Sequence, residues 1–193
     1  MNRDKSMNIE MIFEIIESGN DDLTLAVIDQ FNMNINEKGK GGYTALHIAV
    51  RAGSYKTAAS LIKRGADVNA VTDHNKTPLL IACEKNRYKF VKLLVDNDAD
   101  VNIADNSGTS PLHAAVDESN QQIANCILEH GKNANINIRD NWGRTPVCAA
   151  DNGDVELAEC LINHGANLDI KDNEGNSAWD KAKEMNIYDI ILK

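Results

Sequence analysis

Hydrophobic residues along this chain follow one arrangement that returns about every 33 positions. Each time, a Thr or Ser opens a short apolar run, as in Thr44-Ala-Leu-His-Ile-Ala and Ser110-Pro-Leu-His-Ala-Ala. These runs open at spacings of 33, 33, 35 and 32 residues, at Thr44, Thr77, Ser110, Thr145 and Ser177. Such a period is typical of stacked supersecondary units that bury a continuous core between neighbours. The pattern therefore predicts a repeat architecture and not one globular centre.

Within each unit the apolar spacing predicts two helices. The opening Thr or Ser fits an N-cap, and Pro fits the first helical position because its missing N–H would be unpaired there. All prolines of the chain occupy that position: Pro78, Pro111 and Pro146. First helices are expected at 45–52, 78–85, 111–118, 146–152 and 178–185. Second helices are expected at 55–64, 88–97, 121–130, 155–164 and 187–192.

Residues that tolerate a left-handed backbone mark the ends of these helices. The reversals between paired helices are predicted at Gly53, Asn86, Ser119, Gly153 and Asn186. The second helices are predicted to end at Gly65, Asp98, Gly131 and Gly165. Two residues are inserted after Gly131, and one residue is missing between Ala150 and Gly153. The insertion is either tolerated loop variation, which costs little free energy, or a change of curvature that shapes a binding groove.

Together these features resemble the ankyrin repeat. The second halves of the units agree with it too, as in Leu61-Ile-Lys-Arg-Gly-Ala-Asp-Val-Asn69 and Leu94-Val-Asp-Asn-Asp-Ala-Asp-Val-Asn102. The resemblance runs from about Asn8 to Lys193. It implies an all-α solenoid, in which helix–turn–helix units are joined by short β-hairpin or finger loops.

The resemblance divides the chain into an N-terminal tail, 1–7, and one repeat domain, 8–193. The helices expected at 8–18 and 22–31 lack the Thr-Pro phrase, as a terminal cap does, because one of its faces meets water. We expect the chain to be complete, with no space for an appended effector module. The units are a cap at 8–39, repeats at 40–72, 73–105, 106–140 and 141–172, and a degenerate capping repeat at 173–193.

Composition limits the classes of partner that the chain is expected to bind. The net charge of −9 argues against binding to nucleic acid or to anionic membranes, because both rest on Lys and Arg. No apolar run reaches the roughly 18 residues of a membrane span, and the N-terminus does not resemble a secretion signal. The cysteines show no Cys-x-x-Cys spacing and are predicted to be reduced packing residues of a cytoplasmic protein: Cys83, Cys126, Cys148 and Cys160.

Catalytic constellations are missing from the sequence. There is no nucleophile–base arrangement, phosphate-cradling loop or His-Glu-x-x-His spacing. His47 and His113 occupy the histidine position of the repeated phrase, where the resemblance implies a structural ring that bonds to the next unit. We therefore expect no enzyme, no cofactor and no metal.

The resemblance implies that a partner protein binds at the finger tips and the exposed ends of the first helices. Trp142 is the first candidate anchor, since binding hot spots favour Trp, Tyr and Arg; the alternative is that it stacks on the next finger. The candidate partner-binding residues are Tyr43, Arg51, His74, Lys76, Lys85, Thr109, Asp117, Glu118, Trp142, Arg144 and Asp151.

Charge is unevenly distributed along this surface. The cations lie towards the N-terminal half, at Lys40, Arg51, Lys76 and Lys85, and the anions Asp117, Glu118 and Asp151 follow. An acidic stretch would steer a basic segment of a partner, and the alternative is an ordinary solvated face.

The leading functional hypothesis is a monomeric, non-catalytic protein–protein interaction module that acts as adaptor, inhibitor or scaffold. Heavy use of Asn, Lys and Ile also fits a host-directed effector that is delivered into a host cell. The alternatives are a dedicated inhibitor or stabilising subunit of one endogenous enzyme, an enzyme with an unrecognised site, and a structural spacer.

Overall fold

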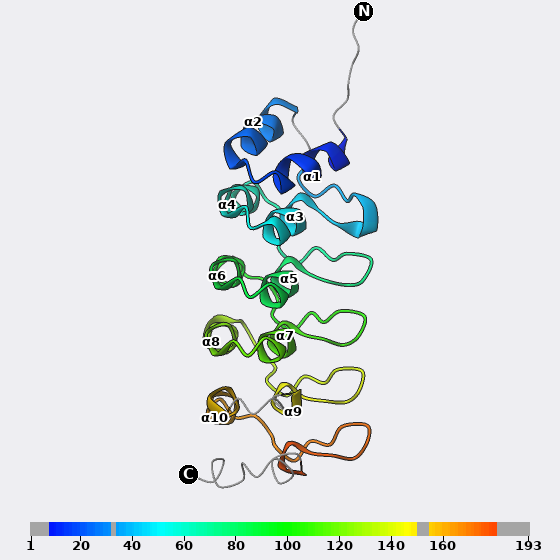
Figure 1. The fold of residues 1–193 in the computed structure, drawn as a ribbon, viewed down its shortest axis with the longest axis vertical. Coiled ribbons are helices and arrows are strands. Elements are labelled where there is room, and N and C mark those ends of the chain that lie inside the picture. The colour runs from blue at the N-terminus through cyan, green and yellow to red at the C-terminus, as the bar shows by residue number, and fades with distance from the viewer. Residues whose placement is uncertain (1–7, 32–33, 150–154, 181–193) are drawn as a thin grey trace, which may run out of the picture.

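The computed structural model describes residues 8–31, 34–149 and 155–180. Helices stack there in two columns along an elongated molecule, and loop fingers project from one side (Figure 1). One column holds α1, α3, α5, α7 and α9, at Ile9–Glu17, Ala45–Ala52, Pro78–Glu84, Pro111–Asp117 and Pro146–Ala149. The other holds α2, α4, α6, α8 and α10, at Asp21–Phe31, Tyr55–Lys63, Tyr88–Val95, Gln121–His130 and Val155–Asn163.

These bounds confirm the predicted helices to within one or two residues wherever the structure describes them. The described residues contain no strand, so the fingers are turns, the first of which holds a short 3-10 helix at Lys40–Gly42. The remaining predictions lie outside the described residues: the tail 1–7, the end of the helix at 146–152, the reversals at Gly153 and Asn186, and most of the helices at 178–185 and 187–192.

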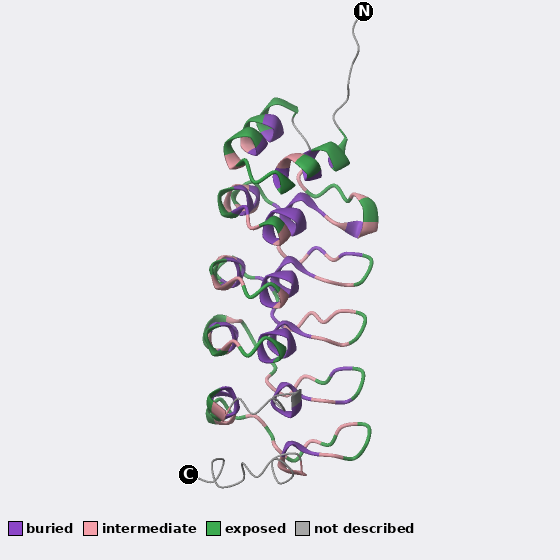
Figure 2. Cartoon of the chain, in the orientation of Figure 1, coloured by how far each residue is buried: buried purple, intermediate pink, exposed green. Residues whose placement is uncertain are grey.

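The core lies between neighbouring first helices. Every residue from Ala45 to Val50 in α3 and from Pro78 to Cys83 in α5 is buried. The leucine of the repeated phrase is 0%, 0% and 2% exposed at Leu46, Leu79 and Leu112. Figure 2 shows α3, α5 and α7 as almost continuously buried, whereas α1 and the second helices bury only one face. Full burial of one such leucine is worth about 1.5–3 kcal/mol, so neighbour contacts supply most of the favourable energy.

The repeated phrase forms the predicted caps. The Thr77 hydroxyl accepts the Leu80 backbone N–H at 3.1 Å, and the Ser110 hydroxyl accepts that of His113 at 3.3 Å. The structural role of the phrase histidines is confirmed. His47 Nε2 lies 3.0 Å from the Lys76 carbonyl oxygen, and His113 Nε2 lies 3.0 Å from that of Arg144, each in the next unit.

Asparagine side chains form a second link between units. An Asn Oδ1 in one unit accepts a backbone N–H of the next unit at 2.8 Å, in four successive places. Because each acceptor satisfies a donor about 30 residues away, these bonds fix the register between neighbours. The acceptor and donor pairs are Asn36 with Asp67, Asn69 with Asp100, Asn102 with Asn135, and Asn137 with Asn167.

The predicted left-handed residues occur at most turns. Gly53, Asn86 and Ser119 have φ of 88°, 53° and 50°, and the second helices are followed by Gly65 and Asp98 with φ of 88° and 64°. All three reversals that fall in the described residues are therefore confirmed.

The prediction of a left-handed residue at Gly131 is wrong. Its φ is −71°, and the left-handed residue is instead Asn133, at 55°. The two extra residues thus lie before Asn133, where they lengthen the end of α8, which has 10 residues against 8 in α6. Glycine is required at 131 for space: a Cβ there would lie 2.4 Å from the Ile127 carbonyl oxygen and 2.7 Å from Val101 Cγ1.

Gly131→Ala is expected to destabilise the protein by about 1–3 kcal/mol, because the added methyl group overlaps backbone and a neighbouring unit. The neighbouring Lys132→Ala is the control, since it removes only an exposed ion pair with Asp98 and should cost at most about 1 kcal/mol. Urea unfolding midpoints measure both. Equal midpoints for the two variants would show that residue 131 is not tightly enclosed.

His47 is expected to make folding sensitive to acid. Burial lowers the pKa of His47 from 6.5 to about 4, so between these values the folded chain binds fewer protons than the unfolded chain. The free energy of unfolding therefore falls as the pH drops from about 6.5 towards 4, by about 3 kcal/mol in total. Above a pH of about 6.5 this loss is absent, because His47 is neutral in both states. An NMR titration of the His47 ring measures the pKa directly, and a midpoint near 6.5 would contradict the assignment.

Candidate protein-interaction surface

The fingers form one continuous edge. In each, a backbone N–H donates to a carbonyl oxygen of the preceding finger, at distances between 2.8 and 3.1 Å. The side-chain amides of Asn141 and Asn173 add bonds of 2.9 Å to the carbonyl oxygens of Asn106 and Asn141. The backbone donor and acceptor pairs are Asp73 with Gly41, Asn106 with His74, Asn141 with Ser107, and Asn173 with Trp142.

An aspartate shapes each later finger from within. The Asp140 carboxylate accepts the backbone N–H groups of Trp142 and Arg144 at 2.9 and 2.8 Å, and its second oxygen accepts Arg144 Nε at 2.8 Å. Its side chain is only 1% exposed. Asp105 and Asp172 accept the equivalent backbone pairs in their fingers. The tip residues are therefore held by a preformed turn and need little reorganisation to bind.

Trp142 lies at such a tip with 55% of its surface exposed. The Arg144 guanidinium carbon lies 5.1 Å from its ring centroid, a distance that suits a cation–π contact. Both residues line a hollow of about 470 Å³ with Asp172, Asn173 and Glu174 of the next finger. The two interpretations of Trp142 are thus compatible, because the ring neighbours the next finger and still presents an open face.

A second hollow, of about 390 Å³, lies beside the first finger and is lined by Tyr43, Arg51 and glutamates of α1. Arg51 lies 4.8 Å from the Tyr43 ring centroid, and its Nη2 lies 2.5 Å from Glu17 Oε1. Tyr43 is half-buried, with its ring edge-on to His47 at 5.8 Å. This end of the surface therefore combines an aromatic ring with both signs of charge.

Ion pairs modify the expected charge pattern. Lys76 Nζ lies 2.5 Å from Glu84 Oε1, and Arg51 pairs with Glu17, so two of the expected cations carry an anion beside them. Lys85, by contrast, is exposed and forms no ion pair in the described part of the chain. The cations of the N-terminal half are therefore partly neutralised, and Arg51 finds its anion in another element of the stack, α1.

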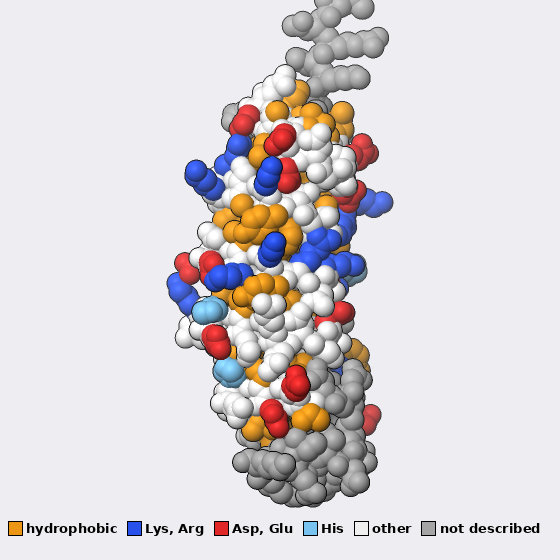
Figure 3. Space-filling view, turned by 60° about the vertical axis from the view of Figure 1, so that its left-hand side comes forward, with side chains coloured by type: hydrophobic (Ala, Val, Ile, Leu, Met, Phe, Trp, Pro, Cys, Tyr) orange, Lys and Arg blue, Asp and Glu red, His pale blue; other side chains and the backbone are white. Residues whose placement is uncertain are grey.

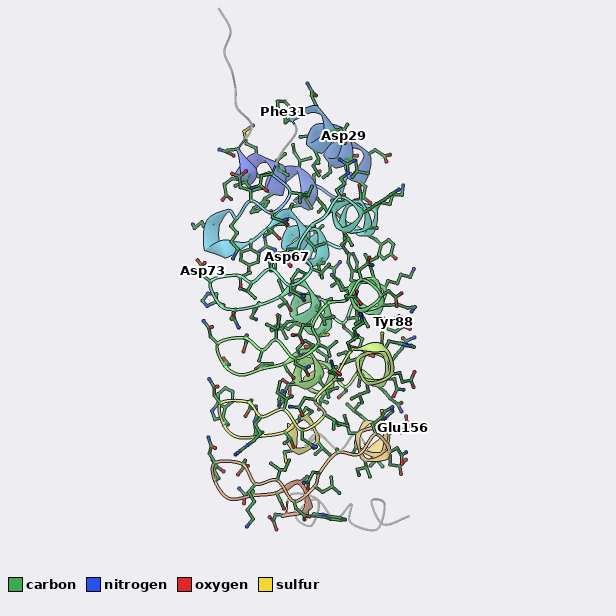
Figure 4. The ribbon with its side chains drawn as sticks, turned by 180° about the vertical axis from the view of Figure 1, so that it is seen from behind. Asp29, Phe31, Asp67, Asp73, Tyr88 and Glu156 are labelled. Atoms are coloured by element: carbon green, nitrogen blue, oxygen red, sulfur yellow. The ribbon has the colours of Figure 1, made fainter. Side chains whose placement is uncertain are left out.

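The remaining candidates lie near the finger side of the stack. Asp117 and Glu118 are exposed where α7 ends, His74 is exposed at a finger tip, and Thr109 is half-buried at the base of one. Asp151 lies outside the described residues. Figure 4 shows Asp73 on the fingers and Tyr88 and Glu156 on the opposite side, on second helices.

The described residues hold no group of three or more His, Cys, Asp or Glu side chains that could bind a metal ion. Cys160 Sγ lies 2.8 Å from Asn125 Oδ1 and 3.9 Å from His164 Nδ1. Burial raises the pKa of the Cys160 thiol, which keeps it protonated and a poor nucleophile. All four cysteines are buried and lie outside any disulfide. Among the described residues no helix is both long and apolar enough to cross a membrane.

Comparison with known proteins agrees with this architecture. Models described as ankyrin repeats (many copies), ankyrin repeats (3 copies) and a single ankyrin repeat match residues 27–82, 70–140 and 142–173. The chain belongs to the ankyrin repeat family, a generally non-catalytic class of protein–protein interaction module. Its fold is similar to that of EF0377, a solved ankyrin repeat protein, with a TM-score of 0.88. The two are 23% identical over 97% of this chain and 98% of that one. No curated protein sequence matches the chain.

Asp140→Ala is expected to lower the free energy of unfolding by about 2–3 kcal/mol, because it strands two backbone donors and leaves Arg144 without its anion. Asp105→Ala is the matched control, since Asp105 accepts the same two backbone bonds but has no arginine partner, and should cost about 1 kcal/mol. Urea denaturation measures both. An equal loss would remove the special role of the Asp140–Arg144 pair.

Proposed function

We propose that this chain is a non-catalytic adaptor, inhibitor or scaffold that binds a partner protein through its finger tips and the adjoining ends of the first helices. The observation that carries the proposal is Trp142, more than half exposed on a turn held by Asp140. An exposed indole costs solvation energy in the free protein, and a partner that covers it regains that energy.

The chemistry of the hollow beside Trp142 supports a partner with a basic side chain next to an apolar one. Trp142 offers an aromatic face, and Glu174 lies exposed on the next finger. Asp117 and Glu118 extend acidic character onto the end of α7. A basic segment would gain association rate from these carboxylates, and salt would reduce that gain.

The four buried thiols support a reducing compartment such as the cytoplasm as the place of action. Each cysteine lies outside any disulfide, and burial raises the pKa of Cys83, Cys126 and Cys160, so these side chains serve as packing residues. Delivery into a host cell and action as a monomer remain parts of the proposal that rest on sequence alone.

Quantitative affinity capture tests the proposal. Wild-type bait is compared with Trp142→Ala, Asp117→Lys, and with a matched variant on the N-terminal cap, Phe31→Ala, Asp22→Lys. Phe31 is 41% exposed and Asp22 is exposed, so both baits lose one exposed aromatic ring and reverse one charge. We expect the finger variant to bind a specific partner about tenfold more weakly or worse, so that the partner is lost from this bait. The cap variant should retain the partner with wild-type affinity.

Recovery of the same proteins with both variants would contradict the finger surface as the binding site. If the partner lost from the finger variant is a single enzyme that wild-type bait captures in a one-to-one ratio, the chain acts as the inhibitor or stabilising subunit of that enzyme. Turnover of a small molecule by the purified chain would contradict the non-catalytic assignment.

A further inference from the structure

The second helices carry a groove on the side of the molecule away from the fingers. It has a volume of about 240 Å³ and runs between α4 and α6. Tyr55, Tyr88 and Leu93 are its apolar lining, and the polar lining residues are Lys89, Lys92, Asp96 and Asn97. Tyr55 is 42% exposed although its ring packs edge-on against Phe90, with the centroids 5.4 Å apart. In the space-filling view of this side, hydrophobic side chains gather at mid-height among Lys and Arg side chains (Figure 3).

This apolar lining coincides with a local excess of positive charge. Helices α4 and α6 contain Lys56, Lys63, Lys89 and Lys92, all exposed, and no Asp or Glu within their bounds. The one ion pair recorded for these lysines joins Lys92 to Asp96, just beyond α6, at 3.1 Å. The whole chain nevertheless carries a charge of −9.

The second helices on either side have the opposite sign. Helix α2 contains Asp21, Asp22 and Asp29 with no basic residue, and α10 contains Glu156 and Glu159 with no basic residue. Helix α8 contains Glu129 and no Lys or Arg. The basic region is therefore confined to the two helices that form the groove.

We propose that this α4–α6 groove is a second docking site, and that it binds an acidic polypeptide segment bearing an aromatic or aliphatic side chain. The apolar side chain would cover Leu93 and the tyrosine rings, and the carboxylates would meet the lysine ammonium groups and tyrosine hydroxyls. Tyrosine suits such a floor because it combines a large apolar area with a polar tip and few rotatable bonds.

Charge complementarity favours a polypeptide over a nucleic acid or a membrane. A phosphate backbone or an anionic bilayer would extend beyond two helices and meet the carboxylates of α2, α8 or α10. A short acidic segment can lie along α4 and α6 alone. Because the groove and the fingers lie on opposite sides of the stack, a partner here leaves the finger surface accessible (Figure 1).

Selection from a random peptide library on the full-length protein tests the proposal. Enriched peptides are labelled and titrated by fluorescence anisotropy, with single-stranded RNA and phosphatidylserine vesicles as further probes. We expect enrichment of acidic peptides with an aromatic or aliphatic residue. Their affinity should fall about tenfold or more in Lys89→Glu, Lys92→Glu, and also in Tyr55→Ala.

The matched control is Lys132→Glu, Lys171→Glu, which has the same net charge and also loses one exposed ion pair, Lys132 with Asp98 at 2.7 Å. It should bind these peptides like wild type, as should Trp142→Ala, Asp117→Lys. Far-UV circular dichroism verifies the fold of every variant, and Lys89→Gln, Lys92→Gln provides a milder change with the same direction of effect.

Three outcomes would overturn the proposal: no acidic peptide with an apolar residue among those enriched, acidic-peptide binding that is equal in the groove variant and its control, or binding of RNA or vesicles with no acidic peptide bound. The finger surface is tested by a different variant and a different partner. Failure of the groove therefore leaves that function standing, and failure of the finger surface leaves the groove standing.

Discussion

The apolar faces of α5 and α7 are covered by the helices before and after them in the stack, and no single unit encloses a core of its own. Leu79, Leu80 and Ala82 are fully buried because α3 and α7 lie on either side of α5. The histidine and asparagine bonds act across the same boundaries and set the spacing at which the helices meet. This dependence on neighbours explains why one phrase must recur at nearly constant intervals.

The same constraint produces the binding surfaces. Almost all side chains of α3 and α5 pack in the core. The side chains available to a partner therefore lie at the finger tips, at the helix ends and on the outer face of the second helices. The finger tips are ordered by their own aspartates and by bonds to the neighbouring finger. The fold thus offers two long sides of different chemistry: a mixed aromatic and charged edge at the fingers, and a basic, tyrosine-lined groove between α4 and α6.

Most helices, caps and turns of the repeats could be predicted from the sequence, because the local preferences of the residues and the spacing of the repeats indicate the same boundaries. The caps at Thr77 and Ser110 and the left-handed residues Asn86 and Ser119 each have a local cause. Gly131 could not be assigned this way: its glycine is needed because Val101 of another unit approaches, and spacing alone does not report that contact. The neutralisation of Arg51 by Glu17 was missed for a similar reason, since the partners are 34 residues apart. The groove could not be predicted because it forms only where Tyr55 of α4 meets Tyr88 and Leu93 of α6, about 33 residues further along the chain.

Circular dichroism of a single excised repeat, residues 73–105, tests the dependence on neighbours most directly, with residues 40–140 as the comparison. The excised repeat carries both helices and its finger but lacks the covering faces of α3 and α7. The account predicts that it has little helix and no cooperative thermal transition, whereas the longer fragment unfolds cooperatively. A helical spectrum with a sharp transition in the single repeat would contradict it.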